Sequence, residues 1–425
     1  MKAASAAVEL MSDDSMVIAG GIHPRYAQGQ EGQLRTTALV LEEGGNKFCL
    51  VSCDVLMVER NILDEAARSI EEQCAIPFTN IIIAATHTHH APSTVRVHGY
   101  DRDEKFVKHL QDAIVSSAVQ ASKKLTADAE VEMHFWLSQE ATVGQNSRLL
   151  LSDGTIFWVG PHDDAIRPTG PFDPELPVWV FKKPEGQTTA LMFNHSTHTI
   201  GTRKGEVRSP SFYGLAAQEL EEELGGTALF LLGAAGSTHN LTLSTDEMVF
   251  RIKQAIREGV AKAQKREVKR LIAVKEEFTY RVRNFDEEAE EQAVTYYCSK
   301  RVKDNPEATI EVFRRMRQAL KLHQGEERKT WLQVVLIGDI ALVAIPGELF
   351  TSLGIDIKRR SPLRYTYIVS LANDWIGYIP DEEGFRLGGY QVWTGFHSFV
   401  EKGTGEAIVD KTVQMLTKLA QDISR

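Results

Sequence analysis

The sequence predicts an α/β protein, with a mixed α+β arrangement as the alternative. Apolar runs typical of strands alternate along the chain with segments of helical periodicity, and this alternation is characteristic of α/β folds. No linker rich in Gly, Pro or Ser interrupts the pattern, so we expect one large domain over residues 1–425. A chain of 425 residues is also long enough to bury a sizeable core.

The elements of the first half follow from periodicity and turn residues. Residues 80–85 (NIIIAA) form a continuous apolar run, which is typical of a strand buried on both faces. The turn signal EGGN at 43–46 separates two β-rich runs. We expect strands at 35–42, 48–55, 80–85 and 130–136, and helices at 61–73 and 103–124.

A segment without regular periodicity, 142–177, divides the chain. Its Gly, Pro, Asp and Ser residues are typical of a functional loop. Beyond it we expect strands at 188–194, 228–232, 331–337, 340–345 and 366–371, and helices at 211–224, 248–265, 287–302, 309–322 and 410–423. The charged helices between about 245 and 325 carry few site-like residues, so they are candidates for a helical lid or subdomain.

Charge and cysteine content exclude several classes of protein. Lys and Arg number 48 against 58 Asp and Glu, a net charge of −10, which disfavours nucleic-acid binding. The four cysteines form no CxxC pair, so neither a zinc ribbon nor a disulfide framework is predicted. We see neither a signal peptide nor an apolar stretch near the ~20 residues of a membrane span. We therefore expect a cytoplasmic protein that acts on a small molecule without membrane insertion, and a homo-oligomer stays open.

Three histidines in four positions follow the apolar strand at 80–85, in the sequence ATHTHHAP. Imidazole is the commonest metal ligand in proteins. In an extended segment His87 and His89 project to the same side, because side chains alternate with a period of two. One is then a candidate metal ligand and the other a candidate proton carrier or substrate contact. The alternative is a polar loop whose histidines are hydrogen-bonded.

Two further motifs follow strands. His195 and His198 lie in FNHSTHT after the strand at 188–194, and ligands of α/β sheets bind where strands end. Glu348 lies in IPGELF at a turn and supplies the oxygen ligand that accompanies two histidines in some zinc sites. The alternative for Glu348 is a helix N-terminal carboxylate that faces the macrodipole.

Two later loops hold candidates whose roles the pattern does not assign. Tyr378 and Tyr390 lie twelve residues apart in turn-rich sequence. The segment 232–240 (LGAAGSTHN) follows another apolar strand, and its small residues permit close approach of the backbone to a ligand. It matches neither GxSxG, GxGxxG nor a P-loop.

In chain order, these segments resemble the neutral (non-lysosomal) ceramidase family and its shorter bacterial relatives over roughly residues 35–393. The family's THTH, H-[PS]-T and PGE motifs match 86–89, 195–197 and 346–348, and its pair of loop tyrosines matches Tyr378 and Tyr390. The sequences DPE at 173–175 and NSRLLLSDG at 146–154 are also similar to the family. The resemblance implies a single catalytic domain of layered sheets flanked by helices.

The resemblance also implies the composition of the site. It implies one zinc ion held by His87, His195, Glu348 and Tyr378. Another divalent metal is the alternative, since two imidazoles with oxygen ligands suit several metals. Three catalytic residues are implied. His89 would be a proton carrier, Arg148 an oxyanion or substrate contact, and Tyr390 a hydrogen-bond donor to the oxyanion. The implied substrate contacts are Asn146, Ser237 and His239.

The chain departs from the family in three places. Ceramidases carry G-D-x-S-P after a late strand, whereas GSTHN at 236–240 puts His239 at the serine position and Ser237 at the aspartate position. The segment 209–211 lacks an expected aspartate, and the sequence stops without the family's C-terminal immunoglobulin-like domain. We therefore expect a relative that acts on a smaller, polar molecule rather than on membrane ceramide.

The expected function is a zinc-dependent hydrolase in which metal-activated water attacks the carbonyl of an amide (C–N) bond. The altered loop at 237–239 favours an alternative, a metal-dependent hydrolase or lyase that acts on an ester, lactone or glycosidic bond of a sugar-like substrate. A binding protein without catalysis is the third class.

Overall fold

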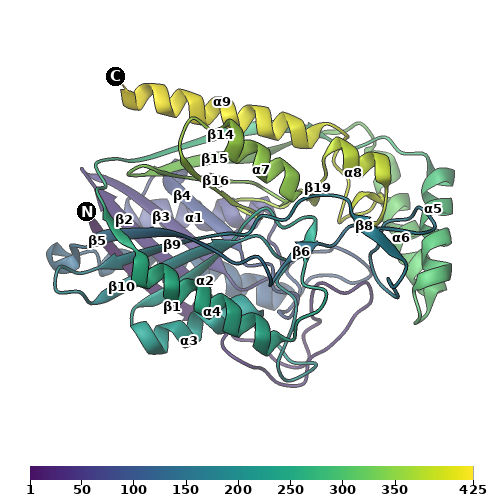
Figure 1. Cartoon of the computed structure of the whole chain (residues 1–425), viewed down its shortest axis with the longest axis horizontal. Coiled ribbons are helices and arrows are strands. Elements are labelled where there is room, and N and C mark those ends of the chain that lie inside the picture. Colours follow the sequence, from purple (N-terminus) through teal and green to yellow (C-terminus); the bar gives the residue numbers. More distant parts are fainter. Residues whose placement is uncertain (425) are drawn as a thin grey trace.

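The protein contains three larger sheets, and each of them includes one pair of parallel strands (Figure 1). The structure is a computed structural model that describes residues 1–424. The first sheet has the order β1-β2-β3-β4, formed by β1 (Lys2–Glu9), β2 (Arg35–Glu43), β3 (Asn46–Cys53) and β4 (Ile81–Ala85). Its first three strands are antiparallel, and β3 and β4 are parallel.

The other two large sheets each contain one parallel pair. The second sheet has the order β11-β10-β9-β5-β13, formed by β5 (Glu132–Gln139), β9 (Glu175–Lys182), β10 (Thr188–His195), β11 (Thr227–Leu232) and β13 (Gln264–Arg266). The third has the order β14-β15-β16-β18, formed by β14 (Leu271–Arg281), β15 (Glu327–Ile337), β16 (Ile340–Ala344) and β18 (Tyr365–Val369). The parallel pairs are β10 with β11 and β16 with β18.

Helices cover the outer faces of the sheets. Against the first sheet pack α1 (Arg60–Cys74) and α2 (Glu104–Lys123), and against the second α3 (Ser211–Leu224) and α4 (Thr245–Lys262). Against the third pack α7 (Thr351–Arg360) and α9 (Thr404–Ser424), while α5 (Glu287–Arg301), α6 (Pro306–Leu320) and the short α8 (Glu382–Leu387) lie at one end of the molecule (Figure 1).

The inner faces of the three sheets share one apolar core. Phe48 of the first sheet, Trp179 of the second and Leu342 of the third belong to the same buried cluster. Each sheet therefore buries one face against other sheets and the other against helices, which explains why β4 and β16 are apolar throughout and why the centre of β10 is apolar. The predicted mixed α/β architecture of layered sheets and flanking helices is confirmed.

Sequence periodicity missed three strands of eight or more residues, β1, β9 and β14, and also the strands of two to four residues. The sequence of β14, LIAVKEEFTYR, mixes charged and apolar residues because only part of this edge strand is buried. The single catalytic domain stays a prediction, as does the helical lid or subdomain at 245–325. Within that range α4 packs on β5 and β9, β14 pairs with β15, and α5 and α6 pack on each other.

Among the described residues, no helix combines the length and the apolar character that crossing a membrane requires.

Candidate metal centre

Loops that leave the carboxyl ends of strands in all three sheets meet at one place. The loop after β4 is joined to the loop after β10, because the main-chain N–H of His89 donates to the carbonyl of Thr199 (3.2 Å). The loop after β11 is joined to the segment after β16, because the N–H of Gly236 donates to the carbonyl of Leu349 (2.9 Å). Segments distant in the sequence thus form one wall.

A buried cluster of nitrogen and oxygen atoms lies at this junction. The Nε2 atoms of His87 and His198 each lie 3.2 Å from Oε2 of Glu348. The Nε2 atoms of His89 and His87 are 3.4 Å apart, and the ligand atoms of the three histidines all lie within 4.8 Å of one another. The Tyr378 hydroxyl is 3.1 Å from Nε2 of His198. All five are buried except His89, which is half-buried.

The tautomers of two of these histidines follow from their other contacts. Nδ1 of His87 lies 2.9 Å from the carbonyl oxygen of Leu56, and Nδ1 of His198 lies 2.8 Å from that of Ala235. A carbonyl oxygen only accepts, so each Nδ1 carries the hydrogen and each Nε2 keeps its lone pair. Burial lowers the pKa of His198, which keeps this imidazole neutral.

This arrangement fits a metal ion. Two nitrogen lone pairs converge on Oε2 of Glu348, a buried oxygen with no hydrogen-bond donor among the described residues. Unprotonated imidazoles and a carboxylate that face one another at 3.2 Å are stabilised by a proton or a metal cation between them. Carbonyl acceptors behind the imidazoles are the usual way in which proteins orient metal-binding histidines. The buried histidine group can therefore hold a metal ion.

The backbone at His87 is strained. Its φ of +64° lies in the left-handed region, which a residue with a Cβ adopts at a cost of about 1–3 kcal/mol. His87 and His89 do face the same cluster, as predicted, but the backbone between them is not extended. A turn at His87, rather than strand alternation, brings the two rings together, and such strain is typical of functional sites.

A short parallel strand pair places the two candidate oxygen ligands, Glu348 and Tyr378, side by side. The strand β17 (Glu348–Leu349) pairs with β19 (Tyr378–Ile379), with Glu348 opposite Tyr378. Gly347 permits this approach, because a Cβ there would lie 2.6 Å from the carbonyl oxygen of Gly377. Since α7 begins three residues after Glu348, the carboxylate does not lie at the start of a helix, and the macrodipole alternative is wrong.

The structure does not bring the predicted ligand His195 to this cluster. His195 is the last residue of β10, and its side chain is fully buried. Its Nδ1 lies 2.5 Å from the hydroxyl of Tyr213 and its Nε2 lies 2.9 Å from the carbonyl oxygen of Glu140. Both ring nitrogens are thus used within the fold. At the cluster the structure places His198 in the position expected for His195, because the chain reaches His198 only after it leaves β10. The H-x-x-H spacing was the signal that sequence reasoning did not use.

Arg148 is hydrogen-bonded to a loop, and no hydrogen bond joins it to the described residues of the cluster. Its guanidinium donates to Oε1 of Gln391 (2.7 Å) and to the carbonyl oxygens of Gly388 (2.7 Å) and Gly384 (3.2 Å). Burial lowers its pKa to about 10, so it stays charged at neutral pH. In this structure Arg148 therefore anchors the segment that carries Tyr390, and its expected oxyanion contact stays a prediction.

Two of the three predicted substrate contacts are used inside the fold. Asn146 accepts from the N–H of Arg148 (3.1 Å) and donates to the carbonyl of Pro171 (3.2 Å). The hydroxyl of Ser237 accepts from the N–H of Thr351 (3.1 Å) at the start of α7. Both side chains are buried, so their role in this structure is to hold loops in place.

His239 and His89 are the half-buried members of the site. The His239 ring stacks on that of His198, with centroids 3.9 Å apart, and its nitrogens make no hydrogen bond to any described residue. Nδ1 of His89 lies 3.3 Å from the carbonyl oxygen of Gly20. Gly20 has a φ of +89°, and a Cβ there would lie 2.2 Å from Nδ1 of His89. Glycine at this position therefore makes room for the His89 ring.

Tyr390 contacts a histidine that sequence reasoning missed. Its hydroxyl lies 3.0 Å from Nε2 of His98, a buried residue of the long loop between β4 and α2. His98 lies eleven residues after His87, outside the clustered motif, and no local pattern in the sequence distinguishes it.

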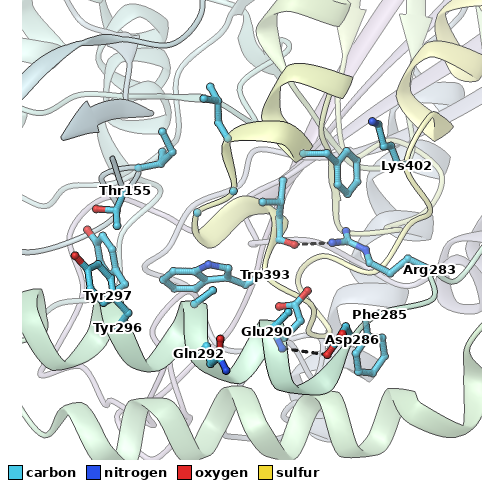
Figure 2. A pocket seen from close by; sticks show the side chains of 18 of the residues that line it. Thr155, Arg283, Phe285, Asp286, Glu290, Gln292, Tyr296, Tyr297, Trp393 and Lys402 are labelled. Atoms are coloured by element: carbon cyan, nitrogen blue, oxygen red, sulfur yellow. Dashed lines mark hydrogen bonds between the residues drawn. The ribbon is translucent and has the colours of Figure 1, made fainter. Parts of the chain in front are cut away.

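A cavity of about 930 Å³ lies beside the segment that carries Tyr390 (Figure 2). It is lined by Trp393, by Tyr296 and Tyr297 of α5, and by Arg283, which donates to the carbonyl oxygen of Val392 (2.5 Å). No residue of the metal cluster lines it. The cavity is therefore separate from the cluster.

Comparison with known proteins identifies the fold. No protein-family model and no curated protein matches the chain. Among solved structures, neutral ceramidase from Pseudomonas aeruginosa matches with a TM-score of 0.76 over 99% of this chain and 74% of that chain, at 17% identity. The chain has the fold of neutral ceramidase. A ceramidase complexed with C2 matches with the same TM-score and identity, over 99% of this chain and 75% of that one.

The neutral ceramidase fold agrees with the resemblance inferred from the motifs, which is confirmed. At 17% sequence identity, the match shows a shared fold and does not show a shared substrate. The chemistry of this chain therefore has to be argued from its own cluster.

Proposed function

We propose that this protein is a metal-dependent hydrolase that cleaves an amide (C–N) bond in a small, polar substrate. The observation that carries the proposal is the convergence of His87 and His198 lone pairs on the carboxylate of Glu348. The ceramidase fold supports the amide bond as the target, because the matched proteins are described as ceramidases.

Zinc is the proposed metal. Two imidazole nitrogens, a carboxylate and the Tyr378 hydroxyl form a donor set of mixed nitrogen and oxygen, which suits zinc and is also compatible with other divalent metals. A zinc ion bound there supplies a Lewis acid that polarises a carbonyl group and activates water.

The half-buried histidines would handle protons and substrate. Burial and the neighbouring imidazoles lower the pKa of His89 well below its usual value, so its Nε2 is available to accept a proton. His89 would then deliver that proton to the leaving nitrogen, the general-acid step of amide hydrolysis. His239 stacks over His198 with free ring nitrogens and would hydrogen-bond the substrate. These polar groups favour a polar substrate over a purely hydrocarbon one.

A second candidate function rests on His239. This residue occupies the position where ceramidases carry a serine, so the substrate contact differs from theirs. Cleavage of an ester, lactone or glycosidic bond of a sugar-like substrate, by hydrolysis or elimination, is the alternative that this difference favours.

The test combines metal analysis with a substrate panel. The purified protein is assayed for bound metal by mass spectrometry and for hydrolysis of N-acyl amides, lactones and glycosides, before and after chelation. We expect one zinc ion per chain, amide cleavage that chelation abolishes, and recovery on addition of zinc. The variant Glu348→Gln should lose both metal and activity. Full activity of a metal-free preparation would contradict the proposal, and turnover confined to lactones or glycosides would select the alternative.

A further inference from the structure

His98 has only one tautomer compatible with its contacts. Its Nδ1 lies 3.0 Å from the carbonyl oxygen of Gly21, which only accepts, so Nδ1 carries the hydrogen. Nε2 therefore has a lone pair, and it lies 3.0 Å from the hydroxyl of Tyr390. Burial lowers the pKa of His98 to about 4, so the ring is neutral at neutral pH. The Tyr390 hydroxyl must accordingly donate its hydrogen to His98.

The ring of Tyr390 is held between two other rings. It stacks on Trp158, with centroids 4.6 Å apart and planes 3° apart, and on His397, with centroids 4.6 Å apart and planes 19° apart. The imidazole of His397 also donates from Nε2 to the carbonyl oxygen of Tyr390 (3.0 Å). The phenol therefore cannot swing away from His98 without breaking these contacts.

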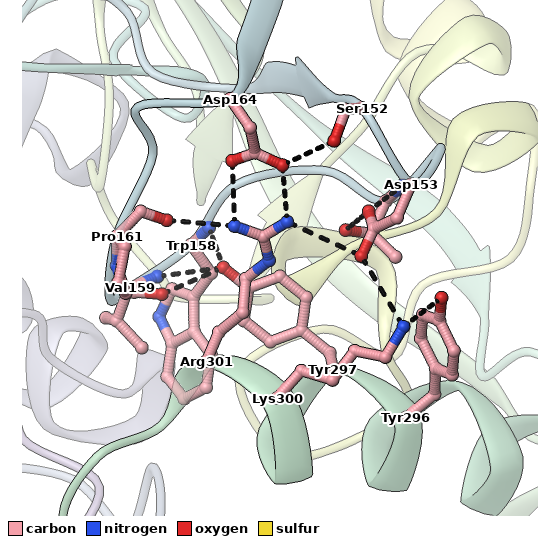
Figure 3. Close-up of polar contacts among 11 residues, drawn as sticks. Ser152, Asp153, Trp158, Val159, Pro161, Asp164, Tyr296, Tyr297, Lys300 and Arg301 are labelled. Carbon is pink, nitrogen blue, oxygen red and sulfur yellow. Dashed lines mark hydrogen bonds and ion pairs between the residues drawn. The ribbon is translucent and has the colours of Figure 1, made fainter.

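A polar network fixes Trp158 in turn (Figure 3). The hydroxyl of Tyr297 accepts from the main-chain N–H of Trp158 (2.7 Å) and donates to the carbonyl of Val159 (3.0 Å). Arg301 forms two hydrogen bonds to Asp164 (3.0 and 2.8 Å) and holds the rest of this loop against α5. The loop is thereby fixed where its indole meets Tyr390.

The segment that carries Tyr390 is anchored from two further sides. Arg148 binds the carbonyl of Gly388 and the side chain of Gln391, and the buried Arg283 binds the carbonyl of Val392 (Figure 2). These hydrogen bonds hold the backbone on both sides of Tyr390, so the surrounding fold sets the orientation of its phenol.

The fixed phenol lies next to the metal cluster. The rings of Tyr390 and Tyr378 meet edge to face, with centroids 5.9 Å apart. A phenol has one hydrogen to donate and lone pairs with which to accept. Because His98 takes the hydrogen, only the lone pairs of Tyr390 are available to a substrate. In this arrangement Tyr390 differs from the expectation of the resemblance, in which it donates to an oxyanion.

We propose that His98 is a specificity-determining positioning residue, which makes Tyr390 an acceptor for an N–H or hydroxyl group beside the scissile carbonyl of the substrate. The inference rests on the proposed function and names its substrate class: amides that keep an N–H, or molecules with a neighbouring hydroxyl. N-methylated amides, and esters without such a hydroxyl, leave the buried acceptor unpaired. Sites built for a hydrogen bond reject analogues that lack the partner, and we expect about tenfold to a hundredfold discrimination here.

The experiment compares matched substrates with the zinc-loaded enzyme. The substrates are an N-acyl p-nitroanilide and its N-methyl counterpart, and the readout is the ratio of their kcat/KM values. We expect the wild type to prefer the N–H substrate by about tenfold to a hundredfold. Tyr390→Phe removes the acceptor and should lower that preference to near one. His98→Leu frees the Tyr390 hydrogen, which the hydroxyl can then donate to the carbonyl of either substrate, so the preference should fall while bound zinc stays unchanged.

His98→Gln is the matched control. Its amide oxygen can accept from Tyr390 near the position of Nε2, so the preference should return. An unchanged preference in His98→Leu, measured on folded and zinc-loaded protein, would overturn the inference. Failure of the wild type to hydrolyse any amide would instead count against the proposed function.

A measurement without substrate decides the inference in that case. Long-range ¹⁵N–¹H spectra of histidine-labelled protein should show His98 protonated at Nδ1, with an Nε2 resonance that shifts in Tyr390→Phe. A His98 protonated at Nε2, or an Nε2 resonance indifferent to Tyr390→Phe, would overturn the inference.

Discussion

Alanine substitutions at His195 and His198 separate a structural histidine from a metal ligand, although the two lie three residues apart. The fully buried His195 bonds the hydroxyl of Tyr213 (2.5 Å) and the carbonyl of Glu140 (2.9 Å). His195→Ala removes a partner from the buried hydroxyl of Tyr213, whereas the carbonyl of the half-buried Glu140 can be hydrated. One unpaired buried group costs ~1–3 kcal/mol, so the free energy of unfolding should fall by about that amount while zinc still binds.

His198→Ala should have the opposite profile. The imidazole makes its Nε2 contacts to Glu348 and Tyr378, and these are the contacts a metal ion would replace. Loss of a group that merely orients a ligand lowers metal affinity about 10- to 100-fold, so we expect loss of the ligand itself to exceed that. Zinc per chain after dialysis, and urea unfolding of the metal-free proteins, measure the two effects. Zinc retained in His198→Ala but lost in folded His195→Ala would refute the reasoning.

Three further predictions concern the surroundings of the cluster. In Gly20→Ala, a Cβ 2.2 Å from Nδ1 of His89 must displace that ring, so kcat should fall about tenfold or more with zinc retained; unchanged kcat would contradict the proton-handling role. In Gly236→Ala, a Cβ 2.2 Å from the carbonyl oxygen of Glu348 should shift β17, which weakens zinc binding in a competition titration with a chelator; wild-type affinity would contradict this. Burial raises the pKa of Asp54 to about 7. Its neutral form therefore contributes stability that is complete below pH 4 and is lost as pH rises through 7, by up to about 4 kcal/mol. Asp54→Asn should remove this loss, so its unfolding free energy relative to wild type should rise between pH 5 and 8; a pH-independent difference would contradict it.

Local sequence patterns predicted the strands that consist of apolar residues alone. The strands β4 and β16 are buried on both faces, so their sequences are apolar without interruption and their bounds are predictable. The edge strand β14 and the N-terminal β1 depend on pairing with distant neighbours, and their composition does not distinguish them from exposed segments.

The site was predictable at the level of motifs and not of geometry. The sequence indicated His87, Glu348 and Tyr378, and the structure brings all three together. The choice between His195 and His198 depends on which residue still lies in the strand and which lies beyond it, and element ends are difficult to place from sequence. The roles of Arg148 and His98 depend on contacts over more than 200 residues of sequence, for which no local pattern exists.

The most direct test of the account is the position of a bound metal ion. Crystals of the purified protein are grown with zinc, and anomalous diffraction is recorded above and below the zinc absorption edge. We predict one strong peak about 2.0–2.2 Å from Nε2 of His87, Nε2 of His198 and a carboxylate oxygen of Glu348. The absence of a peak among these atoms, or a peak coordinated by His195 instead, would contradict the account.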